Sequence, residues 1–276
     1  MASPLISAHE LAVLMREQGV RVLDVRWSLG GPPGRGLYRE GHIPGAVYAD
    51  LESELAGSGQ PTDGRHPLPE EKALQDAARA WGINDGDTVV VYDDVNGTSA
   101  ARAWWLLRYA GVEDVRLLDG ALAGWRAAGH PLHTGDETVA PGSVELHYGH
   151  LPVLSMDEAG ALPDTGVLLD ARAPERFRGE IEPIDPRAGH IPGARNAPTS
   201  GNVDANGKFL PAGQLKAHYA TLGVRPDVPV GVYCGSGVTA AHDALALTLA
   251  GFAPALYPGS WSQWSNHPER PVATGD

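Results

Sequence analysis

The stretch Gly41-His42-Ile43-Pro44-Gly45-Ala46 occurs twice in the chain and returns, letter for letter, as Gly189-His190-Ile191-Pro192-Gly193-Ala194. A second pair precedes it at nearly the same spacing, because Leu23-Asp24-Val25-Arg26 matches Leu169-Asp170-Ala171-Arg172. Matches in the same order across both halves of a chain indicate an internal duplication. The two halves are therefore expected to share one fold.

Further matches extend the repeat through each half. Ser7-Ala8-His9-Glu10 and Ser155-Met156-Asp157-Glu158 both have the pattern of a capping box, in which serine and glutamate side chains satisfy amides at a helix start. The remaining matches are Leu68-Pro69 with Leu210-Pro211, Trp81-Gly82-Ile83 with Leu222-Gly223-Val224, Val89–Tyr92 with Val230–Tyr233, and Gly120 and Trp125 with Gly259 and Trp264.

Each half has the alternating pattern of an α/β fold. In the first half, short apolar runs at Arg21–Val25, Thr88–Tyr92 and Val115–Leu118 predict strands, whereas Glu70–Trp81 and Ser99–Ala110 predict helices. Such alternation favours a mainly parallel sheet with helices on both faces.

We expect two domains of this kind, residues 1–138 and 139–276, because a chain of 276 residues is long enough for two. The polar stretch Thr134–His150, which contains Gly and Pro, is the predicted linker. Trp104 and Trp105 are expected to pack between helix and sheet rather than to bind a substrate.

The composition excludes several classes of partner. Asp plus Glu number 34 against 21 Lys plus Arg, a formal net charge of −13, which disfavours general binding to nucleic acid or to an anionic membrane. No apolar run approaches the roughly 18 residues that a membrane span needs. Met1–Glu10 lacks the basic and apolar blocks of a signal peptide. We therefore expect a cytoplasmic protein.

A single cysteine, Cys234, excludes an intramolecular disulfide and every multi-cysteine zinc motif. His130 and His133, and likewise His147 and His150, have spacings found in metal sites, but no third ligand lies near them in the sequence. Loop and surface positions are the simpler explanation for these histidines. No metal and no cofactor is predicted.

The cysteine lies where the two copies differ chemically. After the matched strand the first copy continues Asp93-Asp94-Val95-Asn96-Gly97-Thr98, whereas the second continues Cys234-Gly235-Ser236-Gly237-Val238-Thr239. The two glycines let the loop turn its backbone amides inward, and the following helix adds its positive end. This environment favours the thiolate, the nucleophilic form of cysteine. The alternative for a lone cysteine is a small buried hydrophobic side chain.

Three other motifs match this loop only in part. Gly235–Ala240 fits a dinucleotide-binding pattern, but residues 256–259 provide no carboxylate for a ribose. A cysteine phosphatase would need an arginine about six residues after the cysteine to bind phosphate, where this chain has Ala240. Ser236 is outside the Gly-x-Ser-x-Gly pattern of hydrolases, so a supporting hydroxyl is its expected role.

The whole chain resembles the tandem-domain sulfurtransferases, which include thiosulfate sulfurtransferase (rhodanese) and 3-mercaptopyruvate sulfurtransferase. The shared features are both repeated motifs, Trp104-Trp105, and Gly259-Ser260-Trp261 with Trp264. The resemblance implies two rhodanese folds, of which only the second is catalytic. It also implies that Cys234 takes a sulfane sulfur from a small-molecule donor, becomes a persulfide, and passes the sulfur to cyanide or a thiol.

The resemblance also implies roles for individual residues. The sequence Cys-Gly-Ser-Gly-Val-Thr is typical of the mercaptopyruvate enzymes, so 3-mercaptopyruvate is the expected donor and thiosulfate the alternative. Ser236 would polarise the donor carbonyl, and His42, on the first repeated motif, would be its proton partner. His190 occupies the same motif in the second half, so anchoring of the loop is the alternative for His42. The remaining active-site loop residues are Gly235, Gly237, Val238 and Thr239.

The resemblance also implies that Arg176 and Arg187 bind the donor carboxylate, a group that a planar guanidinium fits best. A solvated surface charge is the alternative for either arginine. Two functions of other classes stay open: a persulfide carrier or redox sensor without turnover, and a cysteine phosphatase, which Ala240 disfavours.

Overall fold

The computed structural model describes residues 3–17 and 19–276, which form two compact units. Unit 1 comprises Met1–Gly57, Pro69–His150 and Asp204–Phe209, and unit 2 comprises Ser58–Leu68, Leu151–Val203 and Leu210–Asp276. These units differ from the expected division at 138/139 in two respects. The predicted linker lies with unit 1, where its Val144 and Leu146 are buried, and each half of the chain contributes one short segment to the other unit.

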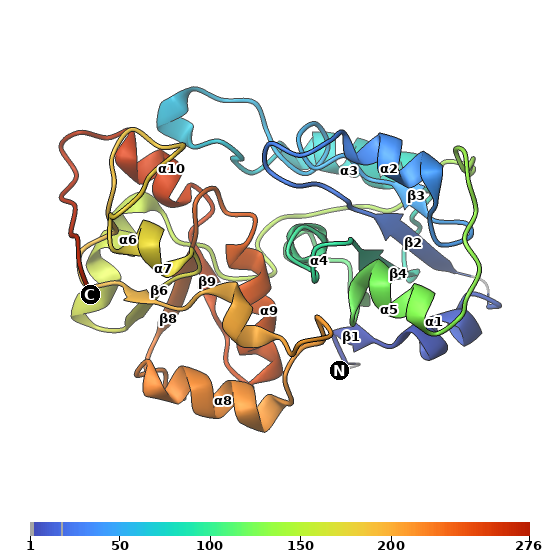
Figure 1. Cartoon of the computed structure of the whole chain (residues 1–276). Coiled ribbons are helices and arrows are strands. Elements are labelled where there is room, and N and C mark those ends of the chain that lie inside the picture. The colour runs from blue at the N-terminus through green and yellow to red at the C-terminus, as the bar shows by residue number, and fades with distance from the viewer. Residues whose placement is uncertain (1–2, 18) are drawn as a thin grey trace. The chain divides into compact units, whose positions relative to one another are not determined.

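Unit 1 has a five-stranded parallel sheet in the order β1-β5-β4-β2-β3. Helices α2 and α3 lie on one side of it, and α1 and α5 on the other (Figure 1). The elements are β1 (Leu5–Ile6), α1 (Ala8–Leu14), β2 (Val20–Asp24), α2 (Gly34–Glu40), β3 (Val47–Tyr48), α3 (Glu71–Ala80), β4 (Thr88–Tyr92), α4 (Ala100–Tyr109), β5 (Val115–Leu118) and α5 (Ala121–Ala127).

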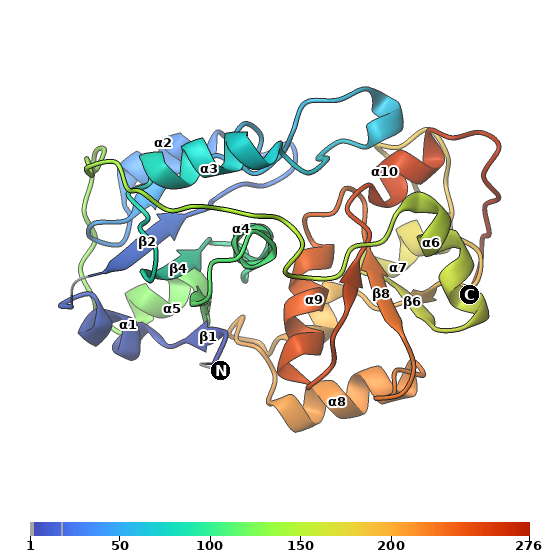
Figure 2. The ribbon, with the colours of Figure 1, turned by 180° about the vertical axis from the view of Figure 1, so that it is seen from behind.

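Unit 2 has a four-stranded parallel sheet in the order β7-β6-β8-β9, and α9 packs on β8 and β9 (Figure 2). The elements are the 3₁₀ turn η1 (Pro61–Asp63), α6 (Met156–Ala161), η2 (Leu162–Asp164), β6 (Val167–Asp170), α7 (Pro174–Phe177), β7 (Arg195–Asn196), η3 (Thr199–Asn202), α8 (Ala212–Thr221), β8 (Val230–Tyr233), α9 (Ala240–Leu249), β9 (Ala255–Leu256) and α10 (Ser260–Ser265).

The duplication extends to the strand register. Asp24 pairs with Tyr92 in unit 1, and Asp170 pairs with Tyr233 in unit 2. The order of the four matched strands is also the same in both sheets. The predicted α/β class and parallel sheets are confirmed, and both capping boxes form as the sequence indicates.

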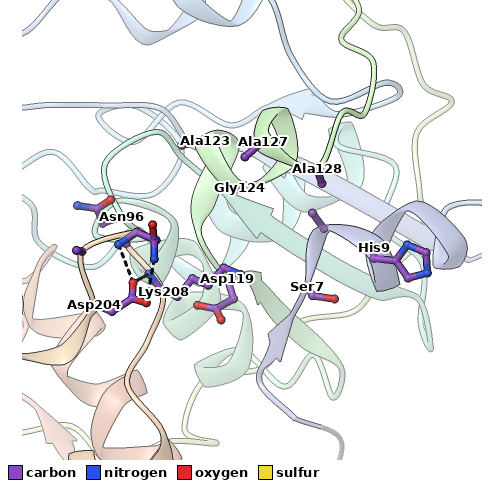
Figure 3. Close-up of a pocket in the computed structure, with 14 residues that line it drawn as sticks. Ser7, His9, Asn96, Asp119, Ala123, Gly124, Ala127, Ala128, Asp204 and Lys208 are labelled. Carbon is purple, nitrogen blue, oxygen red and sulfur yellow. Dashed lines mark hydrogen bonds between the residues drawn. The ribbon is translucent and has the colours of Figure 1, made fainter.

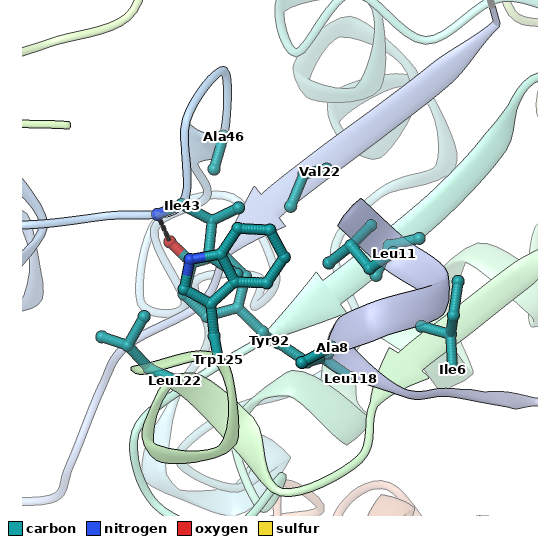
Figure 4. Packing of buried hydrophobic residues seen from close by; sticks show 11 residues of the cluster. Ile6, Ala8, Leu11, Val22, Ile43, Ala46, Tyr92, Leu118, Leu122 and Trp125 are labelled. Carbon is teal, nitrogen blue, oxygen red and sulfur yellow. Dashed lines mark hydrogen bonds between the residues drawn. The ribbon is translucent and has the colours of Figure 1, made fainter. Parts of the chain in front are cut away.

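One hydrophobic cluster of unit 1 lies between its sheet and the helices α1 and α5. Leu11 of α1, Val22 and Tyr92 of the strands, and Leu122 and Trp125 of α5 pack together there (Figure 4). Trp104 and Trp105 on α4 are also buried, as predicted. Burial of this apolar surface is the main driving force for folding of the unit.

The repeated Leu-Asp-x-Arg motif forms a buried network in unit 1. Arg26 Nη2 donates to Asp24 Oδ2 at 2.7 Å and to the carbonyl oxygen of Gly41 at 2.8 Å. The Tyr92 hydroxyl donates to Asp24 Oδ2 at 2.6 Å and accepts the amide of Ile43 at 3.1 Å. One charged pair therefore joins two strand ends to the Gly-His-Ile-Pro loop.

The same network recurs in unit 2. Arg172 Nη2 donates at 2.7 Å both to Asp170 Oδ2 and to the carbonyl oxygen of Gly189, and the Tyr233 hydroxyl accepts the amide of Ile191 at 3.1 Å. A buried arginine and carboxylate are tolerated only when each is paired and hydrogen-bonded. This requirement explains why both copies retain the same letters.

The segments that each half contributes to the other unit, Ser58–Leu68 and Asp204–Phe209, are called the exchanged segments below. They occupy equivalent places in the repeat, because the first ends at Leu68 of one matched Leu-Pro pair and the second ends just before Leu210 of the other. Asp204–Phe209 forms a tight turn, in which the Asp204 carboxylate accepts the amides of Asn206 and Lys208. It borders a cavity of about 840 Å³ in unit 1, beside Asp119 (Figure 3). The amide of Phe209 donates to Asp119 Oδ1 at 2.9 Å and thereby fastens this segment to the unit.

Candidate active site

Cys234 follows β8 directly and is 1% exposed. The amide of Gly237 donates to its Sγ at 3.1 Å. Its own amide donates to Ser260 Oγ at 3.1 Å, and its carbonyl oxygen accepts the amide of Trp261 at 2.9 Å. A backbone amide of the loop thus contacts the sulfur, and residues at the start of α10 bond to the backbone of the cysteine.

The second glycine of the loop, Gly237, is required for steric reasons. Gly237 has φ +78°, and a Cβ there would lie 2.4 Å from the carbonyl oxygen of Pro258. A side chain at this position would therefore disturb the turn that points the Gly237 amide at the sulfur. Val238 is buried, and Thr239 is the residue before α9.

Unit 1 shows what the equivalent loop does when it lacks a cysteine. Asp93 follows β4 and is fully buried, and its carboxylate accepts four backbone amides at 2.8 to 3.0 Å. Those amides belong to Val95, Gly97, Ser99 and Ala100. Burial raises the pKa of Asp93, and these four hydrogen bonds oppose that shift. The loop scaffold is therefore a cradle for an anionic group, which Asp93 fills with its own side chain.

Replacement of Asp93 by alanine is expected to destabilise unit 1 by about 2–3 kcal/mol, because four buried amides would lose their acceptor. The measurement is the free energy of unfolding from denaturant titration. Asp94→Ala is the matched control, since Asp94 is exposed and adjacent. Equal effects of the two substitutions would contradict the role assigned to the cradle.

The partner of Ser236 is a histidine that the sequence analysis did not select. Ser236 Oγ lies 2.8 Å from His66 Nδ1, and both residues are buried. His66 reaches unit 2 on the exchanged segment Ser58–Leu68. The amide of Arg65, which precedes it, donates to Ser262 Oγ at 3.0 Å and fastens the segment to α10.

His42 has the contacts of a structural residue. Its Nδ1 lies 2.9 Å from the carbonyl oxygen of Tyr38, and its ring stacks on the Tyr38 ring at 4.1 Å. His190 does the same with Phe177, at 2.8 Å and 3.8 Å. Anchoring of the Gly-His-Ile-Pro loop explains both histidines. The expected pairing of His42 with the serine is therefore corrected, because that position belongs to His66.

Two arginines lie against the first glycine of the loop. A Cβ on Gly235 would be 3.2 Å from Arg65 Nη2 and 3.4 Å from Arg176 Nη1. Both guanidinium groups bond to Asp185, and Arg176 also donates to Glu182 Oε1 at 2.6 Å. Arg176, an expected donor ligand, thus lies beside the cysteine loop, and so does Arg65, which the sequence analysis did not select.

Arg187 has a different role from the one expected. Its guanidinium group donates to four backbone carbonyl oxygens at 2.7 to 3.0 Å. These carbonyls belong to Trp264, Ser265, His267 and Arg270, around the end of α10. The side chain therefore fixes the C-terminal segment of unit 2, and its hydrogen-bonding capacity is used there rather than for a donor.

Among residues 3–17 and 19–276, no group of three or more His, Cys, Asp or Glu side chains has the arrangement of a metal site. His133 Nδ1 lies 2.8 Å from Glu137 Oε1, and His147 lies beside Glu71. Within the same described residues, none of the helices has the length and apolar character that crossing a bilayer requires.

A parallel α/β scaffold in two copies, with one buried cysteine in a loop after a strand, defines a tandem α/β protein in which unit 2 carries the cysteine. The chain belongs to the rhodanese family, since the model of the Rhodanese-like domain matches residues 7–128 and 155–267. The family expected from the repeated motifs is confirmed.

Relatives with similar sequences are named as sulfurtransferases, a class of enzymes. The chain is 48% identical over 284 residues to a Pseudomonas aeruginosa protein named "Probable 3-mercaptopyruvate sulfurtransferase", with 100% of this chain and 99% of the relative covered. It is 47% identical over 277 residues to SseB of Mycobacterium tuberculosis, provisionally named a thiosulfate sulfurtransferase, with 98% and 97% covered.

The crystal structure of SseA from Escherichia coli, described as a 3-mercaptopyruvate sulfotransferase, matches the fold with a TM-score of 0.85. The two sequences are 35% identical, and the match covers 94% of this chain and 99% of SseA. The likeness therefore extends over both units.

Proposed function

We propose that this protein is a sulfurtransferase that takes sulfur from 3-mercaptopyruvate through Cys234 and passes it to cyanide or a thiol. The observation that carries the proposal is the Ser236–His66 contact of 2.8 Å, two residues from a buried cysteine. A serine hydroxyl with a histidine partner suits a donor that has a carbonyl group, which 3-mercaptopyruvate has and thiosulfate lacks.

In the first half-reaction, the thiolate of Cys234 attacks the donor sulfur. A sulfur–sulfur bond forms, the carbon–sulfur bond of the donor breaks, and its electron pair goes to the methylene carbon as the enolate of pyruvate. The Ser236 hydroxyl donates to the enolate oxygen, and His66 orients that hydroxyl. Uptake of a proton releases pyruvate and leaves a persulfide on Cys234.

In the second half-reaction, cyanide or a thiolate attacks the outer sulfur of the persulfide. The sulfur–sulfur bond breaks, its electron pair returns to Cys234 as the thiolate, and the product is thiocyanate or a persulfide of the acceptor. The Gly237 amide, 3.1 Å from Sγ, stabilises negative charge on the cysteine in both half-reactions. Arg176 and Arg65 would bind the donor carboxylate beside Gly235.

Steady-state kcat/KM with 3-mercaptopyruvate and with thiosulfate, cyanide being the acceptor, tests the proposal. We expect a preference for 3-mercaptopyruvate and a gain of one sulfur atom in the mass of the enzyme when no acceptor is added. A preference for thiosulfate would favour the second candidate, which the anion-attracting amides of the loop also suit. Absence of turnover with either donor would favour a persulfide carrier or a redox sensor.

Ser236→Ala is expected to lower kcat/KM for 3-mercaptopyruvate about 10²-fold, because the enolate oxygen loses its donor. The effect on thiosulfate should be much smaller, since thiosulfate has no carbonyl oxygen to stabilise. The ratio of the two kcat/KM values is the measured quantity. Equal losses with both donors would remove the role assigned to the hydroxyl.

His66→Gln should lower kcat/KM for 3-mercaptopyruvate by about tenfold or more, because the serine loses the group that orients its hydroxyl. His42→Gln is the matched control, as His42 is buried in unit 1 with a structural set of contacts. We expect His42→Gln to lower the thermal unfolding midpoint while the donor preference stays the same. The reverse pattern, with preference lost only in His42→Gln, would return the role to His42.

A further inference from the structure

Six charged side chains of unit 2 form one network next to the cysteine loop. Arg172 pairs with Asp170 at 2.7 Å and with Glu182 at 3.4 Å, and Arg176 pairs with Glu182 at 2.6 Å. Arg176 also bonds Asp185 at 3.2 Å, and Asp185 bonds Arg65 on its other side. Three arginines are thus matched by three carboxylates, and the network has no formal net charge.

Within this network Asp185 alone bridges the two arginines that lie at Gly235. Its side chain is 2% exposed, whereas those of Arg65 and Arg176 are 27% and 17% exposed. Burial raises the pKa of Asp185, and the charge of Arg65 opposes this shift. The carboxylate therefore lies behind the two guanidinium groups, which face the loop in front of it.

We propose that Asp185 selects the donor by its charge: it holds Arg65 and Arg176 in place for one carboxylate and cancels the excess positive charge that would favour a dianion. Asp185 acts through the arginines, so it is a positioning and specificity-determining residue. The inference rests on the proposed function, because it concerns the choice between 3-mercaptopyruvate, which carries one negative charge, and thiosulfate, which carries two.

Electrostatics gives the direction of the effect. Removal of one negative charge behind the arginines increases the attraction for any anion in front of them, and a dianion gains twice as much as a monoanion. At partly exposed groups this difference corresponds to roughly tenfold in relative binding, and salt reduces it. The same logic predicts the opposite shift when Arg65 loses its charge.

The test compares Asp185→Asn with Glu180→Gln. Both remove one negative charge from the same loop, but Glu180 is exposed and pairs with Arg178 at 2.7 Å, outside the network. We expect Asp185→Asn to raise the kcat/KM ratio of thiosulfate to 3-mercaptopyruvate about tenfold at low ionic strength, and less at high salt. Glu180→Gln should leave the ratio within about twofold of the wild-type value.

A second measurement does not depend on turnover. The rate of alkylation of Cys234 by iodoacetate, an anion, divided by the rate with neutral iodoacetamide, reports the charge near the sulfur. Asp185→Asn should raise this quotient and Arg65→Gln should lower it, so the proposal stays testable if one variant fails to fold. An unchanged quotient would overturn the proposal even in an enzyme that transfers sulfur. A raised quotient with an unchanged donor ratio would overturn the selection of the donor.

Failure of the proposed sulfur transfer can be distinguished from failure of the role assigned to Asp185. If wild-type enzyme turned over neither donor, the alkylation quotient of the variants would still show whether Asp185 and Arg65 control the charge at the loop. If wild-type enzyme preferred thiosulfate, a further rise of that preference in Asp185→Asn would still be expected. Equal changes in Asp185→Asn and Glu180→Gln would reduce the effect to overall charge and contradict the assignment.

Discussion

Cys234→Ser is expected to lower kcat/KM for sulfur transfer by at least about 10³-fold with either donor. A serine oxygen is a weak nucleophile without a strong base beside it, and it cannot hold sulfur as a persulfide. Cys234 is the sole cysteine of the chain, so no second thiol can replace it. The measurement is thiocyanate production from each donor, together with the mass of the enzyme after exposure to donor alone.

A control measurement must show that the Cys234→Ser variant is folded. Serine is only slightly smaller than cysteine, and the Gly237 amide can donate its hydrogen bond to an oxygen as well as to a sulfur. The thermal unfolding midpoint should therefore stay close to that of wild type. Retained transfer in a folded Cys234→Ser protein would end the persulfide proposal, whatever the donor.

The largest effect on stability is expected from Asp24→Ala, at about 3–5 kcal/mol. Arg26 is 3% exposed, and this substitution removes the carboxylate that pairs with its buried guanidinium group. The Tyr92 hydroxyl also loses the oxygen to which it donates at 2.6 Å. Hydrogen exchange of strands β2 and β4 measures the loss within unit 1, where the network lies.

A double variant distinguishes the lost pair from the cavity that alanine leaves. Asp24→Leu with Arg26→Met removes both charges and keeps apolar volume, so it should cost clearly less than Asp24→Ala alone. A double variant as unstable as the single one would show that the network contributes more than the avoidance of an unpaired charge.

Most of the fold could be predicted because its signals are local. The strand Thr88–Tyr92 has the predicted bounds, and helix α4 lies within the predicted Ser99–Ala110. The duplication then carried the prediction for one half to the other. The exchange of Ser58–Leu68 and Asp204–Phe209 could not be predicted, since short polar segments have no periodicity that indicates where they pack.

Comparison of the two copies selected candidate residues on the cysteine loop, but it did not select the residues of the exchanged segment Ser58–Leu68. Cys234 and Ser236 followed from comparison of the two loops. His66 was missed, although the two copies also differ chemically just before their matched Leu-Pro pairs. The first copy has Arg65 and His66 there, and the second has Gly207 and Lys208. His42 was selected because the resemblance implies a histidine on the first repeated motif, whereas this motif holds a buried histidine in both halves.

The exchange of segments also bears on how the chain can be divided. Reciprocal exchange of equivalent elements is the hallmark of a swapped homodimer, so this chain has the organisation of two swapped subunits joined end to end. At the equivalent loop position, unit 1 carries the carboxylate of Asp93 and unit 2 carries Cys234. A cut after His150 would separate Cys234 from both Arg65 and His66. A piece that keeps these three residues together must therefore extend across this cut.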